Sequence, residues 1–397
     1  MRTNRITRGA ALPALLSAGL LLTACGTGAD SDDAAADADA EGTPAEIVAT
    51  EPVVTTYDGG LYVLDGQTLD VVADIELEGF NRINPAGDDR HVFVSTSDGF
   101  QVLDAAGAEL TDTLFSADAP GHVVRHGGRT VLFADGTGEI TAFDTDALGE
   151  GMPEETEVHT AEEAHHGVAV ELENGELLLT LGDEEERVGA LVLDADREEI
   201  ARSEDCPGVH GESAAQDEAV AIGCEDGALI YKDGEFTKVE SPDDYGRIGN
   251  QAGSEQSPII LGDYKTDPDA ELERPEQIAL IDTTDADLQL VDLPSSYTFR
   301  SLGRGPDGEA LVLGTDGALH VIDPEAGEIT ESIELMDEWE EPLEWQDPRP
   351  ALFVRGGTAY VSDPATNQVH SVDLGSGEVT GTATLDEAPN ELSGVSH

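Results

Sequence analysis

Short apolar stretches with alternating polar positions recur along the chain, joined in pairs by turns that usually contain Asp-Gly. Each unit is an apolar strand, a turn, a second apolar strand and a closing Asp. Alternating apolar residues around such turns predict β-hairpins. Clear copies occupy residues 91–104, 130–144, 219–234, 310–323 and 358–373, and looser or truncated copies occupy 59–65, 176–194 and 258–282.

The spacing of these units predicts the fold. The closing aspartates run from Asp65 to Asp373, so the seven intervals between them average 44 residues. A period of this length with several short strands per repeat is typical of β-propeller blades. Eight units predict an all-β propeller of eight four-stranded blades; seven blades with a decorated terminus is the alternative. The C-terminal segments GEVTGTATL and ELSGVSH predict the outer strand of the last blade and the innermost strand of the first. This pairing of terminal strands would close the ring and hide its edges.

The first 25 residues are typical of a lipoprotein signal peptide. Three arginines among the first eight residues precede an apolar run over residues 10–22, which is too short for a transmembrane helix. The run ends in Leu-Thr-Ala-Cys, which resembles a bacterial lipobox and predicts lipid attachment to Cys25. An ordinary secretory peptide is the alternative. We therefore expect an exported protein that is lipid-anchored to the outer face of the cell membrane.

Residues 26–50 contain no aromatic residue and are rich in Asp, Ala and Gly, which predicts an acidic, disordered tether. Residues 51–397 would then form a single propeller domain. The whole chain has 85 acidic and 19 basic residues, a formal net charge of −66. Such a charge repels nucleic acid and anionic lipid and attracts cations, so we expect no nucleic-acid partner and membrane contact only through the lipid anchor. A salt-adapted or generally acidic exported surface accounts for most of the carboxylates.

Two cysteines remain besides Cys25. Cys206 and Cys224 are 18 positions apart, and in an oxidising compartment they predict a disulfide. A loop of this size would contribute about 3 kcal/mol in the chain-entropy model. Thiolate ligation of a metal is the alternative.

Three of the 10 histidines follow the repeat. His122, His166 and His210 each stand where the innermost strand of a unit is expected to begin, and their separations are 44 and 44 residues. Residues one blade apart at equivalent positions point the same way, so three imidazoles would converge near one mouth of the channel. Three imidazoles with an exchangeable fourth position are a common arrangement for Zn²⁺. The spacing therefore predicts a zinc site.

Other residues are candidates for completing this site. Glu212 lies two residues after His210, on the same face of an ideal strand, and is a possible fourth ligand. Asp118 and Asp135 are weaker candidates, and water is an alternative. His165 is out of phase with the three histidines and is a possible anchor for a ligating imidazole or an alternative ligand.

The motifs around these residues resemble a known family. The segments EEAHHGVAVELENGELLLTL, EDCPGVHGES and AIGCEDGALI are similar to AztD-type zinc metallochaperones, which are exported β-propellers that pass zinc to the binding protein of an ABC importer. The resemblance extends over most of residues 52–397 and is clearest over 121–227. It implies zinc ligation by the three phased histidines with a nearby carboxylate. Such a chaperone is expected to carry a His-rich segment as well, and the stretch 26–50 contains no histidine.

We interpret the chain as a non-enzymatic zinc carrier that is a monomer and serves the solute-binding protein of a zinc ABC transporter. Zinc binding should weaken below about pH 6, because a ligating imidazole must be neutral. One alternative is a metal-dependent propeller hydrolase or lactonase, since a three-histidine site can activate water. Against it, the chain has no Gly-x-Ser-x-Gly nucleophile elbow. The other alternative is a metal-free protein-interaction propeller.

Overall fold

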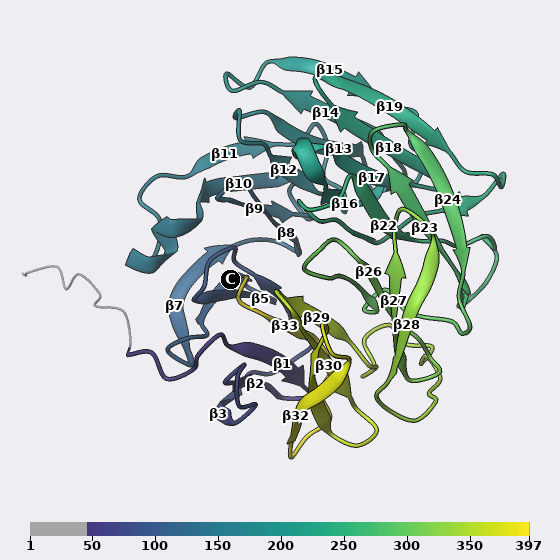
Figure 1. Cartoon of the computed structure of the whole chain (residues 1–397). Helices are drawn as coiled ribbons and strands as arrows, with labels where there is room; N and C mark the ends of the chain where they lie inside the picture. The colour runs from purple at the N-terminus through teal and green to yellow at the C-terminus, as the bar shows by residue number, and fades with distance from the viewer. Residues whose placement is uncertain (1–45, 397) are drawn as a thin grey trace, which may run out of the picture. The chain divides into compact units, whose positions relative to one another are not determined.

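Antiparallel β-sheets arranged around a central channel make up the protein in a computed structural model, which describes residues 46–396 (Figure 1). There are eight sheets; seven have four strands, and the fifth gains a short extra strand. The fold is the predicted eight-bladed β-propeller. The part of the chain that the structure describes has no α-helix; it has two 3₁₀ helices, η1 (Thr145–Glu150) and η2 (Gln216–Glu218).

The strands of each blade are given from the channel outwards. Blade 1 contains β33 (Leu392–Gly394), β1 (Val53–Tyr57), β2 (Gly60–Leu64) and β3 (Val71–Glu76), and blade 2 contains β4 (Arg82–Pro85), β5 (His91–Thr96), β6 (Gly99–Asp104) and β7 (Glu109–Ser116). Blade 3 contains β8 (Pro120–His126), β9 (Arg129–Ala134), β10 (Glu139–Asp144) and β11 (Glu157–Thr160), and blade 4 contains β12 (Ala169–Glu171), β13 (Leu177–Gly182), β14 (Arg187–Leu193) and β15 (Glu199–Ser203).

Blades 5 to 8 follow the same order. Blade 5 contains β16 (His210–Ala214), β17 (Val220–Cys224), β18 (Asp226–Lys232) and β19 (Glu235–Glu240), with β20 (Gly246–Arg247) beside β18, and blade 6 contains β21 (Gln251–Ala252), β22 (Ile259–Asp263), β23 (Gln277–Asp282) and β24 (Asp287–Asp292). Blade 7 contains β25 (Leu302–Arg304), β26 (Ala310–Leu313), β27 (Ala318–Asp323) and β28 (Glu328–Glu334), and blade 8 contains β29 (Leu352–Arg355), β30 (Thr358–Asp363), β31 (Gln368–Asp373) and β32 (Glu378–Thr384).

The hydrophobic core lies between the blades. Second strands are buried along nearly their whole length, and β17 at every position, because a neighbouring blade covers each face of the sheet. Outermost strands such as β24 alternate between exposed and buried residues, because they form the rim. This difference explains why the sequence shows continuous apolar runs in the middle of each repeat and weaker alternation at its end.

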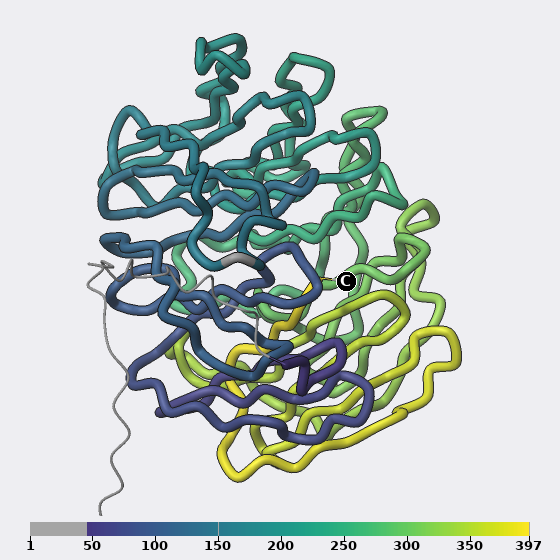
Figure 2. Tube along the Cα trace, turned by 90° about the vertical axis from the view of Figure 1, so that its left-hand side faces the viewer, coloured from purple at the N-terminus to yellow at the C-terminus, as the bar shows by residue number. Residues whose placement is uncertain are grey.

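The two ends of the described chain meet in the first blade. β33 pairs antiparallel with β1, with Val53 opposite Gly394 and Thr55 opposite Leu392. β32 is the outer strand of the eighth blade, as predicted for GEVTGTATL. Val53 and Tyr62 of the first blade share a core cluster with Tyr360 of the eighth. The purple first strands and the yellow last strands therefore lie side by side in both views (Figures 1 and 2).

The predicted signal peptide, the lipobox with Cys25 and most of the predicted tether lie outside the described residues. Residues 46–50, at the C-terminal end of the predicted tether, are among the described residues. The backbone N–H groups of Val48 and Ala49 both donate to the Ala106 carbonyl, and Ala49 is buried. Across residues 46–396, no helix is long and apolar enough to span a bilayer.

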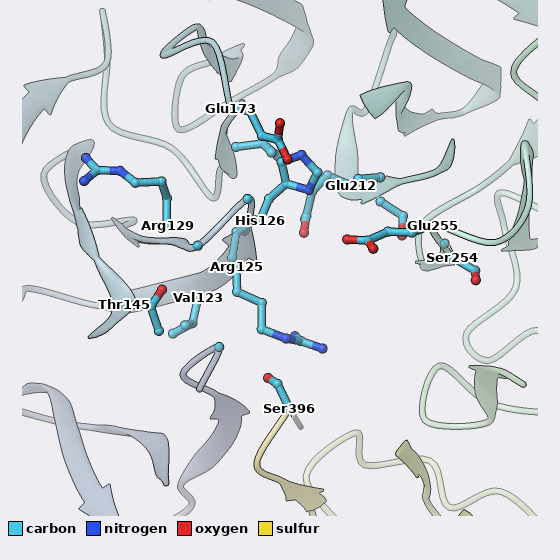
Figure 3. Close-up of a pocket in the computed structure, with 18 residues that line it drawn as sticks. Val123, Arg125, His126, Arg129, Thr145, Glu173, Glu212, Ser254, Glu255 and Ser396 are labelled. Atoms are coloured by element: carbon cyan, nitrogen blue, oxygen red, sulfur yellow. The ribbon is translucent and has the colours of Figure 1, made fainter. Parts of the chain in front are cut away.

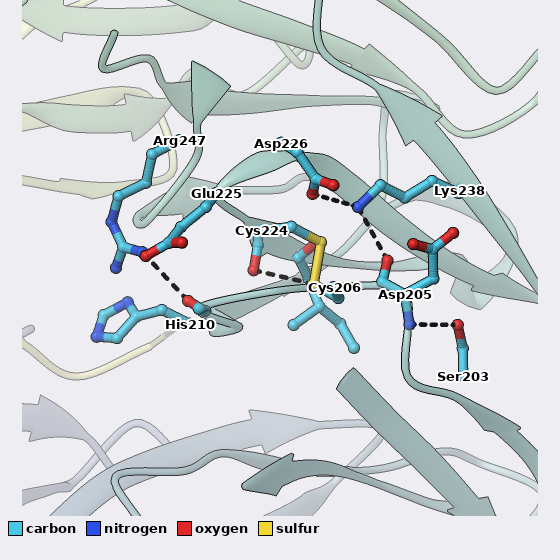
Figure 4. Close-up of a disulfide and its surroundings, with 12 residues drawn as sticks. Ser203, Asp205, Cys206, His210, Cys224, Glu225, Asp226, Lys238 and Arg247 are labelled. Atoms are coloured by element: carbon cyan, nitrogen blue, oxygen red, sulfur yellow. Dashed lines mark hydrogen bonds and ion pairs between the residues drawn. A yellow bond between two sulfur atoms is a disulfide. The ribbon is translucent and has the colours of Figure 1, made fainter. Parts of the chain in front are cut away.

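The predicted disulfide is present. Cys206 and Cys224 are bonded, with Cα atoms 4.9 Å apart, at the base of the segment that leads to His210 (Figure 4). That segment is also held by its backbone, because Cys206 N donates to Val188 O and Gly208 N donates to Arg187 O. The start of the innermost strand of blade 5 is therefore tied to blade 4.

Candidate metal centre

The three phased histidines come together at one end of the channel. His122 lies on β8, His166 just before β12, and His210 at the start of β16. One ligand atom from each imidazole lies within 4.8 Å of the other two, and ring centroids are 5.1 to 5.7 Å apart. Among the described residues, no other group of three or more His, Cys, Asp or Glu side chains is gathered this closely. The 44-residue phase thus brings the side chains of three neighbouring blades to one point.

Two of the imidazoles are anchored through Nδ1. His210 Nδ1 lies 2.5 Å from the Gly249 carbonyl, and because a carbonyl only accepts, this nitrogen carries the proton. His166 Nδ1 lies 2.6 Å from Asp135 Oδ2. Both contacts turn Nε2 towards the centre of the cluster, as in carboxylate–histidine–zinc triads. The structure therefore orients the free nitrogens for ligation.

The closest pair of ring nitrogens is spaced nearly as in a tetrahedral zinc site. The Nε2 atoms of His166 and His210 are 3.1 Å apart. Tetrahedral zinc with Zn–N bonds of about 2.0–2.1 Å places its ligand nitrogens about 3.3 Å apart. For this pair a shift of a few tenths of an ångström would suffice, whereas the nitrogens of the whole cluster lie within 4.8 Å of one another and His122 would have to move closer. The donor set of imidazoles is one that zinc accepts.

Two of the three imidazoles, those of His122 and His210, lie in an environment that keeps them neutral. Burial, together with the neighbouring histidines, lowers the pKa of His122 well below its usual value. Burial also lowers the pKa of His210 to about 3, although the Gly249 carbonyl opposes the shift, and His166 and Arg247 contribute to it. A neutral ring has a free nitrogen lone pair, so both side chains are able to ligate a metal at neutral pH.

The cluster opens into a cavity of about 470 Å³. Besides the histidines, its walls include Asp135, Arg82, Arg247, Lys265 and Trp345. His166 is the most accessible of the three, with 46% of its side chain exposed. The cluster is therefore reached from solvent on the side of His166.

Glu212, the predicted fourth ligand, is not part of the cluster. A β-bulge separates it from His210, and the intervening Gly211 has a φ of +69°. This extra residue breaks the strict alternation of an ideal strand on which the prediction rested. Glu212 instead lines two other channel cavities together with Arg125, and burial raises its pKa to about 8.

His165, the predicted anchor, is a core residue. It is 3% exposed, its Nδ1 contacts the Glu163 carbonyl and its Nε2 contacts Thr180 Oγ1, both at 2.9 Å. Its ring also packs edge-on against Phe133. Gly167 makes this packing possible, because a Cβ there would lie 2.5 Å from Phe133 Cζ and 2.6 Å from His165 Nε2.

Asp135, rather than His165, contacts a ring nitrogen of His166. The sequence indicates Asp135 only as a weak ligand candidate, and it lies in the hairpin turn between β9 and β10, in the blade before His166. Its neighbour Asp118 serves this turn through its backbone carbonyl, which accepts from Gly136 N at 3.0 Å. No periodic signal marks Asp135, since its separation of 31 residues from His166 is not a repeat length.

The fold and the site together define an eight-bladed β-propeller with a three-histidine cluster at one end of its channel. No family model matches the chain. It is similar to the zinc chaperone AztD of Citrobacter koseri, with 26% identity over 303 residues, which cover 74% of this chain and 69% of the relative. The resemblance predicted from the motifs is thus confirmed across most of the sequence.

Solved structures agree with this comparison. Two structures of C. koseri AztD, one of them the apo protein, match with a TM-score of 0.74 at 22% identity, covering 87% of this chain and 96% of theirs. The dihydro-heme d1 dehydrogenase NirN matches less well, with a TM-score of 0.59 at 14% identity over 89% of this chain and 77% of its own. These likenesses support the propeller fold.

Proposed function

We propose that this chain is an extracytoplasmic zinc metallochaperone that holds one Zn²⁺ between His122, His166 and His210. The observation that carries the proposal is the convergence of three imidazole nitrogens within 4.8 Å. The anchoring of His166 by Asp135 and of His210 by Gly249 adds to it, because preorganised rings lose little freedom on binding. The similarity to a protein named as a zinc chaperone supports zinc as the metal.

The site suits a cargo that must leave again. Among the described residues, no carboxylate joins the three histidines in the cluster, so one coordination position is left for solvent or for a ligand of the acceptor. His166 is the most exposed ligand, so it is the one an acceptor would replace first. Zinc would then pass by stepwise exchange of imidazoles. The acidic surface would raise the local concentration of cations before capture.

The acceptor in this proposal is the solute-binding protein of a zinc ABC transporter. The chain would be a monomer, exported and anchored by a lipid on Cys25, with metal binding rather than catalysis as its activity. These statements rest on the resemblance to AztD-type chaperones and on the N-terminal sequence pattern.

The direct test is to titrate zinc into the 26–397 fragment, both as wild type and as the His166→Ala/His210→Ala double variant. Wild-type protein should bind one zinc per chain, and the double variant should lose tight binding while keeping its circular dichroism spectrum. His159→Ala is the matched control, since this histidine lies on the outer strand β11. A double variant that binds zinc as wild type does would exclude the channel site.

A further inference from the structure

The middle of the channel is rich in arginine, although the chain as a whole has a net charge of −66. A cavity of about 590 Å³ lies between the innermost strands, and its walls include Arg82, Arg125, Arg300 and Arg304. In so acidic a chain, each arginine side chain has many carboxylates with which it could form an ion pair. The gathering of four arginines around one cavity therefore needs an explanation.

Three of the four arginines are engaged by the protein itself. Arg82 and Arg300 both reach Glu391, with N–O distances of 3.3 and 2.5 Å. Arg304 donates to backbone carbonyls, including that of Ile259 at 2.6 Å. These contacts link segments that belong to different blades.

Arg125 makes no such contact, although its guanidinium interacts at longer range with the carboxyl group of Glu212, which lines the same two cavities. It lies on β8, three residues after His122, and extends towards the middle of the channel (Figure 3). Within residues 46–396, no hydrogen bond is formed by its guanidinium, and no carboxylate oxygen lies within the 4.0 Å of an ion pair. Arg202, by contrast, forms ion pairs with two carboxylates, Glu162 at 2.5 Å and Glu199 at 2.8 Å.

The surroundings of Arg125 form a ligand-sized space. Arg125 is in the wall that the cavity of about 590 Å³ shares with a second one of about 580 Å³. Val123 and Val170 contribute apolar walls to the second cavity, and the buried Ser396 hydroxyl in the same wall has no partner among the described residues. Cavities of this size are typical of small-molecule sites. The walls of this one are mainly polar, with the valines as apolar patches.

We propose that Arg125 binds the carboxylate of a small organic acid in this part of the channel. A guanidinium presents a planar pair of N–H donors that matches the two oxygens of a carboxylate. The Ser396 hydroxyl provides a further donor, and the valines cover the apolar part of the acid. Glu173, Glu212 and Glu255 also line the second cavity, which favours an acid with one carboxylate over a multiply charged anion.

The test is calorimetric titration with butyrate, with butyramide, phosphate and chloride as comparison ligands at matched ionic strength. Wild-type protein should bind butyrate saturably and butyramide at least about tenfold more weakly, because the amide has no charge for Arg125. Arg125→Gln should weaken butyrate binding by a similar factor, and Arg202→Gln, which removes the same charge from the surface, should leave it unchanged. The melting temperature of Arg125→Gln should change little, because the substitution removes no hydrogen bond or short ion pair and only a longer-range interaction with Glu212 is lost.

Three results would overturn the proposal: unchanged butyrate affinity in Arg125→Gln, equal binding of butyramide, or equal binding of phosphate and chloride. The test is independent of the zinc site. The His166→Ala/His210→Ala variant should bind butyrate as wild type does, so a failure of one proposal is distinguishable from a failure of the other.

Discussion

Asp135 allows the metal centre to be tested without touching a ligand. Its Oδ2 lies 2.6 Å from His166 Nδ1, and this is the contact that turns His166 Nε2 into the cluster. Asp135→Asn keeps the shape of the side chain and removes its charge. Loss of such an outer partner costs about 10–100-fold in metal affinity. That range corresponds to about 1.4–2.7 kcal/mol of binding free energy.

The assay is competition for zinc against a chromophoric chelator at pH 7.5. Asp135→Asn should still bind one zinc per chain, with a dissociation constant raised by that factor and with an unchanged urea midpoint. Asp118→Asn is the control, because this neighbouring carboxylate contributes its backbone rather than its side chain to the turn. A zinc affinity within twofold of wild type for Asp135→Asn would refute the orienting role.

Gly121 gives a second way to displace the same carboxylate. A Cβ at this position would lie 2.1 Å from Asp135 Oδ1, so the Asp135 side chain must move in Gly121→Ala. The variant should weaken zinc binding as Asp135→Asn does, and the two changes together should cost no more than either alone. Additive losses would mean that they act on separate features.

The remaining predictions concern stability. Replacing Cys206 and Cys224 by serine should lower the free energy of unfolding by about 3 kcal/mol in chemical denaturation, and no change would show that the loop is already ordered without the disulfide. His165→Ala should lower the free energy of unfolding by about 2–4 kcal/mol through lost packing and hydrogen bonds. It should leave the zinc stoichiometry at the wild-type value, and a loss of bound zinc would instead support an anchoring role for His165. The folded pKa of His210, about 3, is below the unfolded value of about 6.5. Below pH 6.5 the unfolded chain takes up a proton that the folded apo protein does not, so this histidine destabilises the fold increasingly as the pH falls towards 3. Urea unfolding at pH 7.5, 5.5 and 4.5 should show a steeper acid loss for wild type than for His210→Ala, and equal slopes would contradict the pKa.

The depressed pKa values also change the expected pH dependence of zinc binding. The sequence alone suggested weaker binding below about pH 6, from the ordinary pKa of imidazole. In the folded protein, burial moves proton uptake by His122 and His210 below that range. If these two histidines bind zinc as proposed, protons should compete with the metal there only in more acidic solution than the sequence indicates.

The sequence by itself determined the eight-bladed architecture, because each repeat carries its own local signals. Alternating apolar residues and Asp-Gly turns can be recognised within a few tens of residues, and they recur with a 44-residue period. The phase of His122, His166 and His210 is part of that repeat, so their convergence followed from it. The disulfide also followed from the count and spacing of the cysteines.

Only the tertiary structure decided which residues surround the three histidines. The bulge at Gly211 removed Glu212 from the cluster, and packing against Phe133 placed His165 in the core. Asp135 reached His166 from a turn of the neighbouring blade. Repeat patterns report what is the same in every blade, whereas these contacts depend on local departures from the repeat and on how one sheet packs against the next. Such departures have no periodic signature, so only the packed fold reveals them.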